Sequence, residues 1–124
     1  MDKAFKYDVI VCTFNGASFV SSQLESILSQ AILPQKIIVS DDGSCDETIF
    51  IVRNTFANAN FTAYNIVQGP RKGVIANFLF ALKYSEADFT FLADQDDVWL
   101  RNKVEIFLKY LKEYDLVISN HTAV

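Results

Sequence analysis

Cysteine and histidine are scarce in this chain, which excludes two kinds of cross-link. The cysteines are Cys12, in an apolar run, and Cys45, in an acidic turn, and His121 is the only histidine. Two cysteines in unlike surroundings, with no CxxC spacing, make neither a disulfide framework nor a zinc site. We therefore predict reduced thiols. His121 stays open as a metal ligand, with an ordinary polar residue as the alternative.

Long apolar runs and basic clusters are also missing. The apolar run after the charged N-terminus is about six residues long, too short for a signal peptide or a membrane span. The nearest approach to a basic run is Arg71-Lys72, and the net charge of −4 argues against nonspecific nucleic-acid binding. We therefore expect a cytoplasmic protein, free or peripheral at the inner face of the cell membrane, with no nucleic-acid partner.

Apolar residues, by contrast, make up 51% of the 124 positions, enough for one folded domain over residues 1–124. Short β-rich runs alternate with amphipathic segments. Strands are predicted over residues 7–13, 36–40, 62–68, 89–93 and 116–119. Helices are predicted over residues 18–31, 46–56, 73–84 and 102–114. This alternation predicts an α/β domain with a Rossmann-like, mostly parallel sheet and helices on both faces.

The spacing of apolar residues also predicts which side of each helix packs on the sheet. For the third helix, the predicted inward side chains are Ile75, Phe78, Leu79 and Leu82. Pro34 ends the segment after the first helix, because proline cannot continue the hydrogen-bond ladder.

Acidic residues gather where the predicted strands end. Asp41 and Asp42 follow the second strand, and Asp94, Asp96 and Asp97 follow the fourth. Ligands of open α/β sheets bind beyond these carboxyl ends. Five mutually repelling carboxylates at one edge are explained by a hard divalent cation, Mg²⁺ or Mn²⁺, which prefers carboxylate oxygens and bridges phosphates.

Simpler interpretations remain open for several of these residues. The segment 41–44 is also typical of a turn followed by a helix cap, with Ser44 or Asp46 as the capping residue. The chain has neither GxGxxG nor GxxxxGK[ST], so metal would neutralise a bound diphosphate. Arg71, Lys72 or the amino end of the third helix could assist, or the two cations could form a solvated loop. Trp99 is expected either in the wall of the donor pocket or in the core.

Several segments together resemble family 2 glycosyltransferases of the GT-A fold. They are residues 11–15 (VCTFN), 23–30 (QLESILSQ), 38–48 (IVSDDGSCDET), 73–78 (GVIANF) and 93–99 (ADQDDVW), followed by Lys103. The resemblance covers essentially the whole chain in order, and the ADQDDVW form is similar to bacterial rhamnosyltransferase-type members.

This resemblance implies roles for individual residues. Thr13 and Asp41 would contact the nucleobase, with Asn15 and Asp42 nearby. Three further acids would surround the diphosphate and the metal. They are Asp94, which would approach the ribose and the metal, Asp96, the main ligand of Mg²⁺ or Mn²⁺, and Asp97, which would orient neighbouring groups or the donor sugar.

The resemblance also implies a reaction. A sugar would pass with inversion from a UDP-, dTDP- or GDP-sugar to a glycan or lipid-linked acceptor, and a carboxylate base would deprotonate the acceptor. We expect that base beyond Val124, so the chain would be a truncated GT-A domain that lacks its acceptor-binding half. Such a domain would bind donor without transferring sugar, and its uncovered flank would favour self-association.

Three other functions remain as alternatives. One is a noncatalytic nucleotide-sugar-binding module. The second is a sugar nucleotidyltransferase, which would carry a Gly-rich basic loop after the first strand, where this chain has none. The third is a phosphoacceptor signalling domain, which needs an acid pair after the first strand and a lysine after the fifth. This chain has Thr13 and Asn120 at those points.

Overall fold

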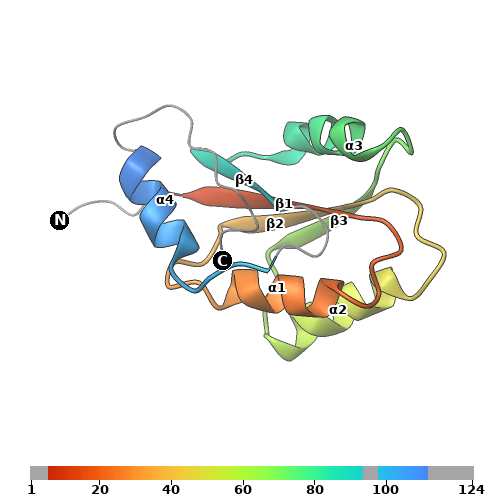
Figure 1. Cartoon of the computed structure of the whole chain (residues 1–124), viewed down its shortest axis with the longest axis horizontal. Coiled ribbons are helices and arrows are strands. Elements are labelled where there is room, and N and C mark those ends of the chain that lie inside the picture. The colour runs from red at the N-terminus through yellow and green to blue at the C-terminus, as the bar shows by residue number, and fades with distance from the viewer. Residues whose placement is uncertain (1–5, 94–97, 112–124) are drawn as a thin grey trace.

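The computed structural model describes residues 6–93 and 98–111. Strands and helices alternate along this part of the chain (Figure 1). The strands are β1 (Tyr7–Thr13), β2 (Lys36–Asp41), β3 (Tyr64–Gln68) and β4 (Phe89–Ala93). The helices are α1 (Val20–Leu28), α2 (Thr48–Asn58), α3 (Val74–Ala81) with a 3₁₀ turn η1 (Leu82–Tyr84), and α4 (Lys103–Leu111).

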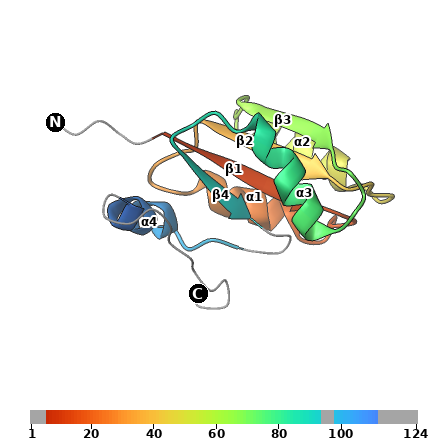
Figure 2. The ribbon, with the colours of Figure 1, turned by 90° about the horizontal axis from the view of Figure 1, so that it is seen from above.

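The strands form one parallel sheet in the order β3-β2-β1-β4. Helix α3 covers one face, and α1, α2 and α4 lie on the other (Figures 1 and 2). The predicted α/β class, the parallel sheet and the helices on both faces are therefore confirmed. The predicted strand 116–119 and the predicted helix end at 112–114 lie outside the described residues.

Most of the apolar core lies between the sheet and the helices α1, α2 and α4. All seven residues of β1 are buried, as expected for a central parallel strand. Leu24 of α1, Phe56 of α2 and Val104 of α4 belong to one buried cluster with this strand. A smaller cluster, formed by Ile10, Cys12, Ile38 and Ala81, lies under α3.

The predicted ends of the first two helices were wrong by two or three residues. Helix α1 ends at Leu28, and the Gln30 side chain instead donates to the Leu100 carbonyl before α4 and accepts the Val104 N–H in the first turn of α4. Helix α2 begins at Thr48, whose N–H donates to the Asp46 carboxylate at 3.0 Å. Asp46, rather than Ser44, thus binds the start of this helix.

The predicted inner face of α3 was wrong for three of its four residues. Ile75, Leu79 and Leu82 are exposed, whereas Phe78 is half-buried and packs against the cluster under α3. The buried residues of the helix are Ala81 and Asn77. The reason lies on β2, where the Ser40 hydroxyl donates to Asn77 Oδ1 at 2.6 Å and the Ser40 carbonyl accepts from Asn77 Nδ2 at 3.0 Å. A polar position in the sheet thus selects the polar side of the helix.

None of the helices in residues 6–93 and 98–111 has the length and apolar character needed to cross a membrane.

Candidate nucleotide-sugar site

The carboxyl ends of β1 and β2 are joined side by side. Thr13 and Asp41 are register partners in the parallel pair. The Thr13 hydroxyl donates to Asp41 Oδ1 at 2.7 Å, and the N–H of Asp42 donates to the Thr13 carbonyl at 2.9 Å. The structure thus brings Thr13, Asp41 and Asp42 together at the edge where ligands of parallel sheets bind.

The Asp41 carboxylate organises the loop that follows it. Its Oδ1 also accepts the Ser44 hydroxyl at 2.6 Å, and its Oδ2 accepts the N–H groups of Ser44 at 2.8 Å and of Gly43 at 3.2 Å. A carboxylate offers about four acceptor positions, and with the Thr13 bond all four are used. Asp41 therefore makes the turn that the simpler interpretation required, and it has no free oxygen lone pair for a metal.

Asn15 holds the loop after β1 against the loop after β2. Its Oδ1 accepts the N–H of Cys45 at 2.7 Å, and its own N–H donates to the Ser44 hydroxyl at 2.8 Å. The backbone of Asn15 has a φ of 50°, a left-handed conformation that asparagine tolerates better than most residues. Asn15 lies near the expected base site, but its side-chain oxygen is occupied by the neighbouring loop.

Asp46 supplies a second link between these loops. Its Oδ2 accepts the N–H of Ala17 at 3.2 Å, and its Oδ1 accepts both the N–H and the hydroxyl of Thr48. The hydrogen bond from the Thr48 hydroxyl is the main cause of a lowered pKa of the Asp46 carboxyl. The Thr48 hydroxyl also accepts the N–H of Gly16 at 2.9 Å, so the two loops form one bonded unit.

A third loop, after β3, joins this unit through Asp42. Asp42 Oδ1 accepts the backbone N–H of Arg71 at 2.6 Å. The Arg71 guanidinium then lies against Gly43, where an added Cβ atom would come within 2.8 Å of Arg71 Nε. Gly43 has a φ of +100°, a conformation that side-chain-bearing residues rarely adopt.

A pocket of about 370 Å³ opens between these loops, β3 and α2. Its lining residues are Asp41, Gly43, Ser44, Ile49, Arg53, Ile66, Val67, Gln68 and Arg71. Two guanidinium groups, one carboxylate and an apolar wall suit a ligand that combines a flat ring with anionic or hydrogen-bonding groups. Neither guanidinium forms an ion pair with a carboxylate in the described part of the chain.

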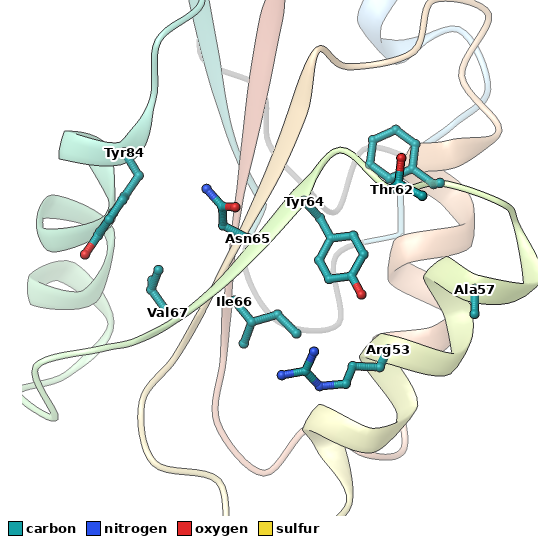
Figure 3. Close-up of a pocket in the computed structure, with 9 residues that line it drawn as sticks. Arg53, Ala57, Thr62, Tyr64, Asn65, Ile66, Val67 and Tyr84 are labelled. Atoms are coloured by element: carbon teal, nitrogen blue, oxygen red, sulfur yellow. The ribbon is translucent and has the colours of Figure 1, made fainter.

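A second pocket, of about 720 Å³, follows the outer edge of β3 (Figure 3). It shares Arg53, Ile66 and Val67 with the first pocket, so the two form one groove around this strand. In Figure 3, Arg53 comes from α2 on one side of β3, and Tyr84 comes from the other side. Sequence reasoning did not identify Arg53, because a polar side chain on an amphipathic helix gives no sign that it lines a pocket.

The acidic segment with Asp94, Asp96 and Asp97 lies outside the described residues, and so does His121. The residues on its two sides contact different elements. Ala93, buried at the end of β4, pairs with Val11, and the Trp99 N–H donates to the Ser26 hydroxyl of α1 at 2.9 Å. The chain thus enters this segment from the end of β4, beside β1.

Trp99 itself belongs to the core. Its indole is 4% exposed, 5.7 Å from the Phe91 ring, and covered by the Lys103 ammonium at 4.7 Å. The core interpretation of Trp99 is therefore favoured over a place in the pocket wall.

A divalent cation fits this edge only with ligands from the acidic segment. No cluster of three acidic, histidine or cysteine side chains suited to a metal occurs among the described residues. Asp41 is fully hydrogen-bonded, and Asp42 Oδ1 accepts the Arg71 N–H. Asp94, Asp96 and Asp97 lie outside the described residues, so the expectation of Mg²⁺ or Mn²⁺ there follows from their residue type.

Lys72 is exposed, directly before α3. It does not line either pocket described above.

Comparisons with known proteins agree with this architecture. The sequence model of Glycosyl transferase family 2 matches residues 8–124. A UDP-Glc:alpha-D-GlcNAc-diphosphoundecaprenol beta-1,3-glucosyltransferase of Escherichia coli is 30% identical over 98 residues, covering 79% of this chain and 38% of the relative. A dTDP-rhamnosyl transferase of Shigella flexneri is 31% identical over 100 residues, covering 77% of this chain and 34% of the relative.

Among solved structures, a mannosyltransferase of Pyrobaculum calidifontis in complex with GDP-Man and Mn²⁺ matches with a TM-score of 0.81 and 25% identity. The match covers 90% of this chain and 33% of that one. The GT-A fold is thereby confirmed, and the nucleotidyltransferase and signalling-domain alternatives are disfavoured. The chain spans less than two fifths of the length of each of these three proteins.

Proposed function

The chain belongs to glycosyl transferase family 2, and we propose that it binds the nucleoside diphosphate of a sugar donor at the carboxyl ends of β1 and β2. One observation carries this proposal. The loops after β1, β2 and β3 are hydrogen-bonded into a single unit that frames a pocket with Asp41, Arg53 and Arg71 in its wall. That combination is suited to a nucleobase with its attached ribose and phosphates.

Within this site we assign the base to Thr13, Asp41 and Arg71. The Thr13 and Ser44 hydroxyls that now bind Asp41 can rotate, so a base N–H can replace one of them at the carboxylate. The Arg71 guanidinium lies on Gly43 at the same wall and can face a base carbonyl or the ribose. Asn15 and Asp42 hold the loops in place.

The diphosphate and the sugar are assigned to the acidic segment. Asp96 is the proposed principal ligand of Mg²⁺ or Mn²⁺, Asp94 is assigned to the metal and the ribose, and Asp97 to the sugar. Lys72 is the proposed cationic helper at the diphosphate. A bound cation would stabilise the charge that develops on the departing nucleoside diphosphate. The three similar proteins named above act on or bind UDP-, dTDP- and GDP-sugars, so all three donors are candidates.

The reaction we propose is inverting sugar transfer to a glycan or lipid-linked acceptor. The relative from Escherichia coli acts on a diphosphoundecaprenol-linked acceptor, which supports the lipid-linked choice. Because this chain spans less than two fifths of the relatives from Escherichia coli and Shigella flexneri, we propose that it supplies donor binding and that the acceptor-side base lies in another part of a longer enzyme. A noncatalytic nucleotide-sugar-binding module has the same support and differs only in whether transfer follows.

Calorimetric titration of the 124-residue chain with UDP, dTDP and GDP, each with Mn²⁺ or with a chelator, tests the donor site. We expect binding that depends on Mn²⁺, and we expect Asp96→Ala to abolish that dependence without unfolding the domain. Asp41→Asn should weaken binding roughly ten- to hundredfold and change the order of the three nucleotides, since an unmatched buried polar group costs about 1–3 kcal/mol.

The Asp41→Asn variant is expected to fold. Its amide oxygen can accept the two backbone N–H groups, and its NH₂ can donate to the two hydroxyls, which then reverse their direction. Asp88→Asn, an exposed acid before β4, is the matched control and should bind like the unmodified chain. If Asp41→Asn leaves the order of the three nucleotide affinities unchanged, residues 41–44 form a turn and do not select the base. Nucleotide binding that survives both Asp96→Ala and the chelator would refute the metal assignment.

A further inference from the structure

Helix α3 is apolar on both its inner and its outer side. Asn77 is its only polar side chain, and it is 1% exposed against the sheet. The outer side carries Ile75 at 77% exposure, Leu79 at 65% and Val74 at 54%, and Leu82 of η1 follows at 41%. Helices on the surface of a water-soluble domain present polar side chains on their outer side. A contiguous exposed apolar stripe of this kind marks a surface that something else covers.

The charge of this region indicates what covers it. Residues 59–85, which follow α2 and include α3 and η1, contain three cationic side chains and no carboxylate, whereas the remainder of the chain has seven more acids than bases. Lys72 directly precedes α3, and Lys83 lies in η1, with its ammonium 4.2 Å from the centroid of the Phe80 ring. The next carboxylate along the chain, Glu86, is paired with Lys36 at 3.0 Å. The apolar stripe is therefore bordered by cations at both ends.

We propose that α3 is a membrane-docking surface, which lies in the plane of an anionic lipid bilayer. Ile75, Leu79 and Leu82 enter the boundary between headgroups and acyl chains, and Lys83 binds lipid phosphates, whereas Lys72 stays assigned to the donor diphosphate. An apolar helix face flanked by lysines is the arrangement of interfacial helices. The negative charge of the rest of the chain is repelled by the same lipids, so the bilayer also orients the domain with α3 toward it.

A second copy of the chain fits this surface less well. A twofold contact between two α3 helices pairs the same patch with itself, so each lysine is placed against the cationic border of its partner. Lysine is also depleted in protein–protein interfaces, in contrast to headgroup regions. Helix α3 lies on the opposite sheet face from α1 and α2, so docking leaves those helices in water (Figures 1 and 2).

The test is cosedimentation of the 124-residue chain with vesicles of phosphatidylglycerol and phosphatidylethanolamine, compared with vesicles of phosphatidylcholine. We expect binding to the anionic vesicles that weakens with salt. Ile75→Asp and Leu79→Asp should each lower the partition coefficient roughly tenfold or more. Phe50→Asp is the matched control, because Phe50 is 63% exposed on α2 and the substitution adds the same charge. Lys83→Gln should have a smaller effect and should reduce the salt dependence.

Insertion is measured separately with acyl-brominated lipids mixed into the anionic vesicles. The tryptophan of an Ile75→Trp variant should be quenched, whereas the buried Trp99 of the unmodified chain and the tryptophan of a Phe50→Trp variant should not. The proposal fails if the unmodified chain stays in the supernatant, or if Ile75→Asp and Phe50→Asp bind vesicles equally. It also fails if light scattering shows a dimer in the absence of lipid and the sole effect of Ile75→Asp is to dissociate that dimer.

Nucleotide binding keeps this proposal distinct from the donor-site proposal. Ile75→Asp and Leu79→Asp should titrate with nucleotide like the unmodified chain, since both side chains point away from the sheet. Loss of vesicle binding with intact nucleotide binding confirms two independent surfaces. Intact vesicle binding in a chain that binds no nucleotide would refute the donor site and leave the docking surface standing.

Discussion

The face of the sheet that α1, α2 and α4 cover contributes to a cluster of fifteen buried apolar residues, whereas the cluster under α3 has four, counting the described residues. On the first face, helices bury their apolar side and turn their polar side to water. On the second, α3 buries Asn77 and exposes Ile75 and Leu79. The two faces therefore differ in where large apolar side chains lie, inside on the first face and largely outside on the second.

The first prediction concerns stability and removes one large side chain from each face of the sheet. Phe56→Ala on α2 deletes a fully buried ring and should lower the free energy of unfolding by about 3–5 kcal/mol. Ile75→Ala on α3 deletes an exposed side chain and should change it by about 0.5 kcal/mol or less. Urea unfolding followed by circular dichroism measures both. Comparable losses in the two variants would mean that α3 packs its outer side against the domain.

The second prediction concerns the polar contact under α3. Asn77→Ala removes the partner of the buried Ser40 hydroxyl and should lower the free energy of unfolding by about 1–3 kcal/mol. Ser40→Ala combined with Asn77→Ala should cost less than the sum of the single changes, since no orphaned hydroxyl is left. A double-mutant cycle by urea unfolding gives the coupling. Simple additivity would show that the two side chains act independently.

The third prediction tests the edge at which both faces meet. Gly43→Ala forces a side chain into a left-handed conformation and against Arg71, with an expected cost of about 1–2 kcal/mol. Ala57→Gly on α2 serves for comparison, because its cost of about 1 kcal/mol comes from helix propensity alone. Thermal unfolding compares the stability of the two variants. Nucleotide titration then distinguishes them, since only Gly43→Ala should displace the Arg71 guanidinium and weaken binding. Unchanged nucleotide binding in Gly43→Ala would argue against Arg71 as a donor contact.

The smallest expected effect comes from Asp46, whose pKa is lowered mainly by the Thr48 hydroxyl. A folded-state pKa below the unfolded value gives stability that is present above the ordinary carboxyl pKa of about 4 and is lost as the pH falls through the folded pKa. The unmodified chain should therefore be more stable than Asp46→Asn at pH 7, and the difference should shrink toward pH 3. A difference in urea midpoints that is constant over this range would contradict the assignment.

The sequence was sufficient for the four described strands, to within two residues, and for the sheet edge that Thr13 and Asp41 share. Strands β1 and β4 were predicted to the residue, because buried parallel strands are short apolar runs with sharp ends. The same runs placed Thr13 and Asp41 at one sheet edge, since parallel strands align their carboxyl ends.

Contacts between loops could not be predicted in the same way. The bonds of Asn15 to Ser44 and Cys45 join positions 29 and 30 residues apart, and no periodicity encodes them. The use of all Asp41 lone pairs by Thr13 and by the loop after β2 is equally invisible in a list of acidic residues. The inner residues of α3 were predicted wrongly in part because apolar spacing gives no sign of the contact between Ser40 and Asn77.

Gly69 connects the two surfaces proposed above for different ligands. A Cβ atom at this position would lie 2.4 Å from Asn77 Oδ1 of the α3 helix and 2.7 Å from Asp42 Oδ1 of the donor loop. Each of those oxygens is held by its own hydrogen bond, from the Ser40 hydroxyl and from the Arg71 N–H. In evolutionary terms, a larger residue at position 69 has to shift both of these side chains at once. Such a residue is therefore expected together with changes at Asn77 or Asp42.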